Sequence, residues 1–93
     1  MQFEWDVNKN HINYQKHGLN FNDAEFIFAG KIVSFMDERK DYGENRFITL
    51  GELNKRVVVV VHTQHECTIR IISMRKANER EKKIYYKRLE EIG

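Results

Sequence analysis

The sequence predicts an α+β fold: a small antiparallel β-sheet meander with helices packed on one face. Three observations predict it. Several short stretches alternate apolar and polar residues, which is typical of strands. Two other stretches place apolar residues at helical spacing. The strands expected in the second half are joined by short turns, and sequential strands joined in this way usually pair as antiparallel neighbours. The expected order is β-α-α-β-β-β-β-α.

The first half begins with a short alternating strand at residues 2–5, and two helices follow it. Asn8 is expected to cap the first helix, which runs to His17, and Gly18 is expected to end it in a left-handed conformation. Either Asn20 or Asn22 then caps a second, shorter helix, which ends at Gly30. The apolar face of this second helix consists of Phe21, Ala24, Ile27 and Phe28.

The second half reads as four strands and a final helix. Residues 32–35 form the first of these strands, and residues 37–45, with seven charged or glycine residues, form an exposed loop. Residues 46–52 alternate again before a turn at Asn54-Lys55. The five consecutive valines at 57–61 predict a strand buried on both faces and therefore central in the sheet.

A turn at 64–66 leads into a last strand at 68–74. From Ala77 onward the periodicity becomes helical, with Ala77, Ile84, Tyr85, Arg88 and Ile92 along one stripe. Charged residues surround this stripe.

Length and composition limit the chain to a single domain, residues 1–93. A lone cysteine, Cys67, cannot form an internal disulfide, and no targeting segment opens the sequence, so we expect a cytoplasmic protein. The longest apolar run, 57–61, is far too short to cross a bilayer. Net charge is only +2, but Lys and Arg gather in the last third. A solvated helix face is the alternative explanation of that run.

The residues support metal-independent chemistry on a phosphate better than metal chemistry. No pair among the four histidines and the cysteine has the spacing of a zinc site, and phosphate-binding glycine loops are absent. We therefore expect neither metal nor cofactor. RNA can be cut without metal, because the ribose 2′-hydroxyl attacks its own phosphate. The protein then has to position the phosphate, move two protons and stabilise added negative charge.

Three groups of side chains before the last helix suit that task, and each has a structural alternative. Lys16 and His17 end the first helix, where the helix dipole alone favours cations. His62 follows the valine run, and a hydrogen-bonded histidine at the sheet edge explains it equally well. Alternation places Arg70 on the face of Ile72 and Met74. A carboxylate, from Glu52 or Glu44, could be its partner there instead of phosphate.

The fourth group opens the last helix and comprises Arg75, Lys76, Glu81, Lys82, Tyr85 and Tyr86. Glu81 and Tyr85 are four residues apart and share a helical face. Tyr85 also belongs to the apolar stripe, so a core position is its alternative. The single tryptophan, Trp5, is expected to pack in the core or at its edge rather than stack on a base.

The ordered set of motifs resembles the BrnT family of toxins over nearly the whole chain. The opening matches at residues 3–6 (Phe-Glu-Trp-Asp), Asn8-Lys9, Lys16-His17-Gly18, Phe21 and Ala24. The second half matches at Glu44-x-Arg46-Phe47, Gly51, Val-Val-Val-His62-Thr63, Ile69-Arg70-Ile71-Ile72-Ser73-x-Arg75-x-Ala77, Glu81 and Tyr85. Two departures are Met74, where small residues are common, and Tyr86, where an acidic residue often follows Tyr85.

This resemblance implies the toxin of a type II toxin–antitoxin pair, with a RelE-like fold and metal-independent endoribonuclease activity that arrests growth. It implies a BrnA-like antitoxin that binds operator DNA, and a heterotetramer of two toxins and two antitoxins. Carried over by motif, the site residues are Lys16, His17, His62, Arg70, Arg75, Glu81 and Tyr85. Arg70 and Arg75 are then expected to stabilise phosphate charge, Lys16 or His62 to transfer protons, and Tyr85 to orient the substrate.

We expect the arginines and His62 to converge on one exposed patch. Two alternatives remain beside the ribonuclease: a non-catalytic nucleic-acid binder that uses the basic last helix, and a module that serves only to bind the antitoxin. Salt-dependent binding without cleavage would indicate the first alternative.

Overall fold

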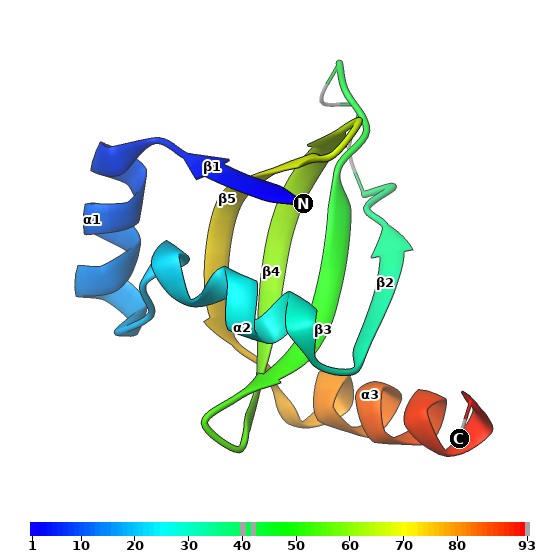
Figure 1. Ribbon diagram of the computed structural model, residues 1–93. Helices are drawn as coiled ribbons and strands as arrows, with labels where there is room; N and C mark the ends of the chain where they lie inside the picture. The colour runs from blue at the N-terminus through cyan, green and yellow to red at the C-terminus, as the bar shows by residue number, and fades with distance from the viewer. Residues whose placement is uncertain (40, 42, 93) are drawn as a thin grey trace.

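The computed structural model describes residues 1–39, 41 and 43–92, and it confirms the α+β fold and the expected order of elements (Figure 1). A single 3₁₀ turn, Phe21–Asp23, precedes α2. The strands are β1 Gln2–Trp5, β2 Ile32–Met36, β3 Phe47–Leu53, β4 Arg56–His65 and β5 Thr68–Lys76. The helices are α1 Val7–His17, α2 Ala24–Ala29 and α3 Glu79–Ile92. No described helix is long and apolar enough to span a membrane.

The five strands form one mixed sheet in the order β1-β5-β4-β3-β2. Strands β2 to β5 make the predicted antiparallel meander, and β4 is the middle strand of the whole sheet. The sheet is not antiparallel throughout, however, because β1 pairs in parallel with β5. The α1–α2 segment separates β1 from the meander and allows the chain to reach the far edge of the sheet, which a local pattern of residues does not reveal.

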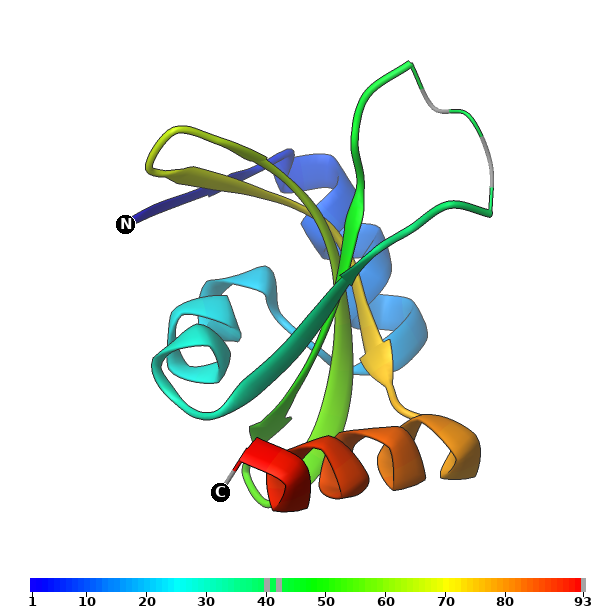
Figure 2. The ribbon, with the colours of Figure 1, turned by 90° about the vertical axis from the view of Figure 1, so that its right-hand side faces the viewer.

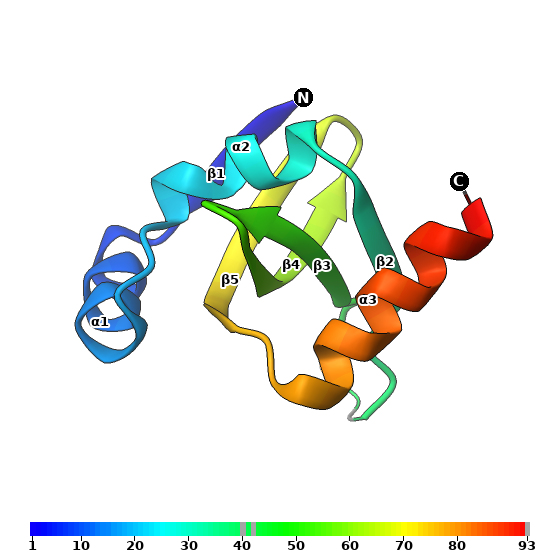
Figure 3. The same ribbon diagram turned by 90° about the horizontal axis from the view of Figure 1, so that it is seen from below.

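The expectation that all helices pack on one face is wrong. Val58 and Val60 face α2 in one core cluster, whereas Val57 and Val59 face α3 in a second cluster. Figure 3 shows α2 and α3 on opposite sides of the sheet. The physical reason lies in β4, whose consecutive valines put apolar side chains on both faces, so that each face needs a cover.

Helix α1 lies along the outer edge of β5, where its buried Asn13 accepts a hydrogen bond from the Met74 amide (3.2 Å). Its N-cap is Asp6 rather than Asn8, because the Asp6 carboxylate accepts from the amides of Asn8 and Lys9. Gly18 ends the helix as expected, with φ 70° and its amide bonded to the Tyr14 carbonyl.

Helix α2 and the 3₁₀ turn before it pack closely over the sheet through Phe21, Ala24 and Ile27, which are fully buried. Asn20 caps the 3₁₀ turn before α2 by accepting from the Asn22 amide, and Gly30 follows its last residue as expected. The close packing of α2 on β3 requires a glycine at position 51, because a Cβ there would lie 2.7 Å from the Ile27 side chain.

Two turns and one bulge fix the strand positions. The turn at Asn54 and Lys55 joins β3 to β4 with positive φ at both residues (51° and 66°), as a tight two-residue hairpin requires. A register shift in the β4–β5 pairing lies between Val61 and His62. Because this shift leaves an extra residue in β5, Arg70 and Met74 lie on opposite faces of the sheet, contrary to simple alternation.

The expected loop at 37–45 has no helix or strand among its described residues, and Lys40 and Tyr42 lie outside them. Asp37, expected to be exposed, is buried, and its carboxylate accepts from the Arg39 guanidinium (2.8 Å). The loop therefore begins with an anchored residue.

Helix α3 crosses the end of the sheet that carries the β3–β4 turn (Figure 2). Its buried side is Tyr85 with the partly buried Leu89, whereas Ile84 and Ile92 of the predicted stripe are exposed. Through Tyr85 and Leu89 the helix packs on β2, β3 and β4. The apolar side of α3 that packs on the sheet is therefore narrower than the sequence predicted.

Candidate nucleic-acid interface

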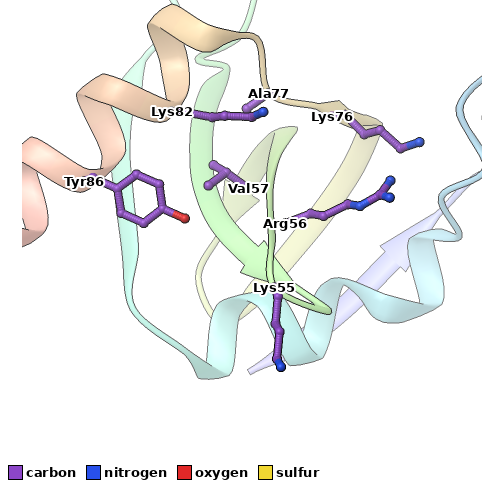
Figure 4. Close-up of a pocket in the computed structure, with 7 residues that line it drawn as sticks. All are labelled: Lys55, Arg56, Val57, Lys76, Ala77, Lys82 and Tyr86. Atoms are coloured by element: carbon purple, nitrogen blue, oxygen red, sulfur yellow. The ribbon is translucent and has the colours of Figure 1, made fainter.

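A pocket with a basic lining opens between the start of α3 and the β3–β4 turn (Figure 4). We call it the basic pocket. Its lining residues are Lys55, Arg56, Val57, Lys76, Ala77, Lys82 and Tyr86. In Figure 4, the Tyr86 hydroxyl points inward from α3, and Arg56 and Lys76 extend in a common direction away from it. Four cations and one exposed aromatic ring thus surround a single hollow.

Four separate elements bring these cations together. The tight turn exposes Lys55, and Arg56 begins β4 directly after it. Lys76 ends β5 opposite Val58 of β4. Helix α3 contributes Lys82 and Tyr86, which are four residues apart and therefore lie on one side of the helix. All of these positions lie in a turn, at a strand end or on a helix surface, where a charged side chain keeps its contact with water and folding does not have to desolvate it.

The pocket is electropositive because no carboxylate lines it, although the chain has 14 Asp and Glu residues. Lys82 pairs with Glu79 (3.1 Å) on the exposed surface of α3. Such an exposed pair contributes little energy and exchanges readily. The lining therefore presents several cations at once to an anion that enters from solvent, and guanidinium and ammonium groups are the usual ligands of phosphate.

Arg75 and Glu81 form a bidentate ion pair beside the pocket. Nη1 and Nη2 of the guanidinium donate to Oε1 and Oε2 of the carboxylate over 2.8 and 2.7 Å. Hydrogen bonds from Arg75 lower the pKa of Glu81, and those to Glu81 raise the pKa of Arg75. Glu81 also accepts from the Asn78 amide, and Asn78 caps the Glu81 amide in return. This capping box fixes the first turn of α3, and the Arg75–Glu81 pair joins that turn to the end of β5.

The structure places Tyr85 in the core and Tyr86 at the pocket. Tyr85 is buried, its hydroxyl donates to the Lys31 carbonyl (2.8 Å), and burial raises its pKa. Tyr86 is 46% exposed and packs edge-on against Tyr85. The aromatic ring that a ligand in the basic pocket meets is therefore that of Tyr86, and the sequence had left open which of the two faces the site.

His62 lies on the opposite face of the sheet, under α2. Its ring is buried between Phe28, which it meets edge-on, and Phe47, on which it stacks. Its Nε2 is 2.7 Å from the Thr49 hydroxyl, which is in turn 2.7 Å from the Ser34 hydroxyl. Burial lowers the pKa of His62, and a smaller contribution from the Thr63 backbone raises it. The ring is therefore held neutral in the core.

The expected convergence of Arg70, Arg75 and His62 is wrong. Arg70 lies on the face opposite His62, near the other end of β5 from Arg75. Its guanidinium is 3.7 Å from the carboxylate of Glu4 in β1, a partner that the sequence did not suggest because β1 was not expected beside β5. Of the predicted residues, Arg75 and Glu81 are joined by hydrogen bonds.

Lys16 and His17 lie at the C-terminal end of α1, outside the basic pocket. His17 lines a second hollow that shares Arg56 and Lys76 with the basic pocket. Arg56 and Lys76 thus lie between His17 and the basic pocket, because they line both hollows. No interaction of Lys16 with another charged side chain occurs among the described residues.

Two pocket residues, Lys55 and Arg56, were not among the site residues that the sequence predicted. Their position could have indicated a site, because they are two consecutive cations at the tight turn between two buried strands. Trp5 packs on the first core cluster and meets Phe21 edge-on, as expected for a packing residue. Within the described residues, no three His, Cys, Asp or Glu side chains gather as a metal site would need.

Comparison with protein families gives one match over most of the chain. The matching family model is described as the ribonuclease toxin BrnT of type II toxin–antitoxin systems, and it aligns with residues 5–81. A comparison with curated proteins finds no match. The aligned range contains Lys55, Arg56 and Lys76 of the basic pocket and ends at Glu81, so it includes the Arg75–Glu81 pair and stops short of Tyr86.

The buried His62 predicts a loss of stability in acid. Because its folded-state pKa lies below the value of 6.5 that it has when unfolded, the unfolded chain binds the proton more readily. The free energy of unfolding should therefore fall as the pH drops below about 6.5, by at most about 1.4 kcal/mol per pH unit from this group. Urea denaturation between pH 8 and 5 measures it.

The control for this prediction is the exposed His65. The His62→Gln variant should lose less stability on acidification than the wild type, and His65→Gln should follow the wild type. Equal pH dependence in all three proteins would show that His62 is not held neutral by burial.

Proposed function

Since this chain belongs to the BrnT family of ribonuclease toxins, we propose that the basic pocket binds the phosphate at which the RNA strand is cut. The family implies RNA cleavage and a cognate antitoxin. The observation that carries the proposal is the gathering of Lys55, Arg56, Lys76 and Lys82 around one hollow whose lining has no carboxylate.

The pocket suits the charge change of the reaction. Attack by the 2′-hydroxyl on the adjacent phosphorus gives a pentavalent phosphate with an additional negative charge, and departure of the 5′-oxygen leaves a cyclic phosphate. Fixed cations that meet this charge stabilise the transition state more than the ground state. Arg56 offers bidentate contact to two phosphate oxygens, and the lysines act as point charges. The flat ring of Tyr86 offers a base a surface on which to stack.

Proton transfer is assigned to one side chain of the basic pocket and one of the neighbouring hollow. The Tyr86 hydroxyl points into the basic pocket, and His17 lines the neighbouring hollow, which shares Arg56 and Lys76 with the basic pocket. A positioned acid or base contributes typically about 10²–10⁴-fold to a rate. The mechanism needs no metal ion, because the nucleophile belongs to the substrate and the cations of the protein meet the charge.

Arg75 acts in this proposal as a positioning residue. Its guanidinium is already engaged by both oxygens of Glu81, and the pair fixes the start of α3. Lys82 and Tyr86 follow on that helix, so their place in the pocket depends on the pair. We assign Arg75 this role in place of direct contact with phosphate.

The antitoxin is proposed to be BrnA-like, to bind operator DNA on behalf of the complex, and to assemble as two antitoxins with two toxins in the cytoplasm. Free ribonuclease activity harms the host. An antitoxin that covers the basic pocket with acidic side chains would block the phosphate site directly, and charge complementarity would speed its binding.

A second function is a nucleic-acid binder that does not cleave. The observation in its favour is that cations dominate the pocket, and cations are sufficient for binding. The two functions differ in one outcome, because only the first converts RNA to shorter products.

We expect the purified protein to cut single-stranded RNA in excess EDTA and to leave a 2′,3′-cyclic phosphate end. The Arg56→Ala/Lys76→Ala variant should cut at least about 100-fold more slowly, because two charge-stabilising groups are lost. A gel with time points measures both rates, and thermal unfolding checks the fold of each variant.

The matched control is Lys83→Ala/Lys87→Ala, which removes two cations from exposed positions of α3 outside the pocket. It should cut at nearly the wild-type rate. Intact RNA after incubation with wild-type protein that binds it would indicate the non-catalytic binder. Wild-type cleavage by the folded Arg56→Ala/Lys76→Ala variant would remove the pocket from the mechanism.

A double-mutant cycle tests the positioning role of Arg75. If Arg75 acts only through Glu81, then Arg75→Ala, Glu81→Ala and the double variant should all lose similar activity. Direct contact of Arg75 with phosphate predicts instead that Arg75→Ala loses markedly more than Glu81→Ala. Single-turnover cleavage rates decide between them.

A further inference from the structure

Two hollows continue the basic pocket along the surface. The first shares Arg56 and Lys76 with it and reaches His17 at the end of α1. The second shares His17 with the first and runs along α1 beside β5. Three neighbouring hollows thus connect Tyr86 on α3 with Lys9 near the start of α1, and each shares at least one cationic or titratable side chain with the next.

The whole path carries one sign of charge. None of the three hollows has an Asp or Glu in its lining, although such residues are 14 of the 93 in the chain. Helix α1 itself contains no Asp or Glu between Val7 and His17, whereas α3 mixes acidic and basic residues. An anion on this path therefore meets no repelling carboxylate from α1 or from the lining of the three hollows.

The far hollow combines cations with an apolar floor. Lys9, Ile12 and Lys16 are spaced by three and four residues and therefore share one side of α1. Ile12 is 62% exposed, and Ile72 of β5 lines the same hollow. Asn13 lies there too, but its amide is committed to the Leu19 carbonyl and the Met74 amide. The hollow therefore offers an anion two ammonium groups and a flat group an apolar surface.

We propose that these hollows form one track for single-stranded RNA, running from Tyr86 past Arg56 and Lys76 to Lys9 and Lys16. Cations along the track meet successive phosphates, and apolar or aromatic surface at each end, Tyr86 and Ile12, meets unpaired bases. Backbone charge combined with such surfaces is how single strands are bound without a sequence requirement. A duplex keeps its bases stacked inside and cannot use these surfaces.

Lys16 and His17 have a second effect on the track. The C-terminus of a helix carries a partial negative charge that repels phosphate. Two basic side chains in the last turn of α1 offset that charge at the point where the track passes it. The pair at this end therefore permits an anion to approach a helix terminus that would otherwise be unfavourable.

This proposal rests on the proposed function, which makes RNA the ligand of the basic pocket, but its test measures binding affinity and does not require cleavage. The probes are RNA strands of three and twelve nucleotides with 2′-O-methyl groups throughout, which cannot be cleaved. The variant is Lys9→Ala/Lys16→Ala and the matched control is Lys83→Ala/Lys87→Ala. Fluorescence anisotropy gives each affinity at several salt concentrations, and thermal unfolding checks each fold.

The track predicts that the Lys9→Ala/Lys16→Ala variant loses affinity for the long strand and not for the short one. Lys9→Ala/Lys16→Ala should bind the twelve-nucleotide strand about tenfold more weakly, with a salt dependence reduced by about 1.4, because two phosphate contacts disappear. The three-nucleotide strand should bind it as it binds the wild type, and the control should behave as wild type with both. A twelve-base-pair duplex should lose no more affinity with the variant than with the control.

The track would be overturned if Lys9→Ala/Lys16→Ala and the control lost equal affinity for RNA. It would also be overturned if Lys9→Ala/Lys16→Ala lost equal affinity for the short and the long strand. The track would also be overturned if the Lys9→Ala/Lys16→Ala variant kept its RNA affinity and lost affinity for the antitoxin, since the surface would then be a protein interface. Failure of the proposed function is distinguishable, because the track requires length-dependent binding whether or not unmodified RNA is cleaved.

Discussion

The structure depends on the burial of β4 on both faces. Val57 and Val59 need a cover on one side and Val58 and Val60 on the other, so α3 and α2 occupy opposite faces. This division determines where charge can gather. His62, on the α2 side, is enclosed by aromatic rings and kept neutral, whereas the α3 side leaves the ends of β4 and β5 open to water. The cations of the basic pocket lie at this open end.

Helix α3 converts that open end into a pocket. Its position is fixed at three points: the bidentate Arg75–Glu81 pair, the reciprocal capping by Asn78, and the hydrogen bond from Tyr85 to the Lys31 carbonyl. The helix then presents its next residues, among them Tyr86, to the β3–β4 turn. Residues that support the site are thus buried or paired with each other, and residues that meet the ligand are surface cations and the Tyr86 ring. The exposed Glu79, which pairs with Lys82, is a weak partner that phosphate can replace.

Much of the fold could be predicted because the evidence for it is local. The valine run, the Asn54-Lys55 turn and Gly18 each act through neighbouring residues. The site was harder, because it depends on contacts between distant elements. The pairing of β1 with β5 gave Arg70 an unexpected partner, and the bulge after Val61 reversed its face. Motif resemblance identified the family, which the family match confirms, but could not show that Tyr85 is buried and that Arg75 is engaged.

The central claim is that phosphate binds between the β3–β4 turn and α3. A crystal structure of the protein with an uncleavable, 2′-O-methylated RNA strand tests it most directly. The account predicts a phosphate within hydrogen-bond distance of Arg56 and Lys76, with a base against the Tyr86 ring and Arg75 still paired with Glu81. A phosphate bound instead by Arg70 on the far end of β5, or one held by Arg75 released from Glu81, would contradict it.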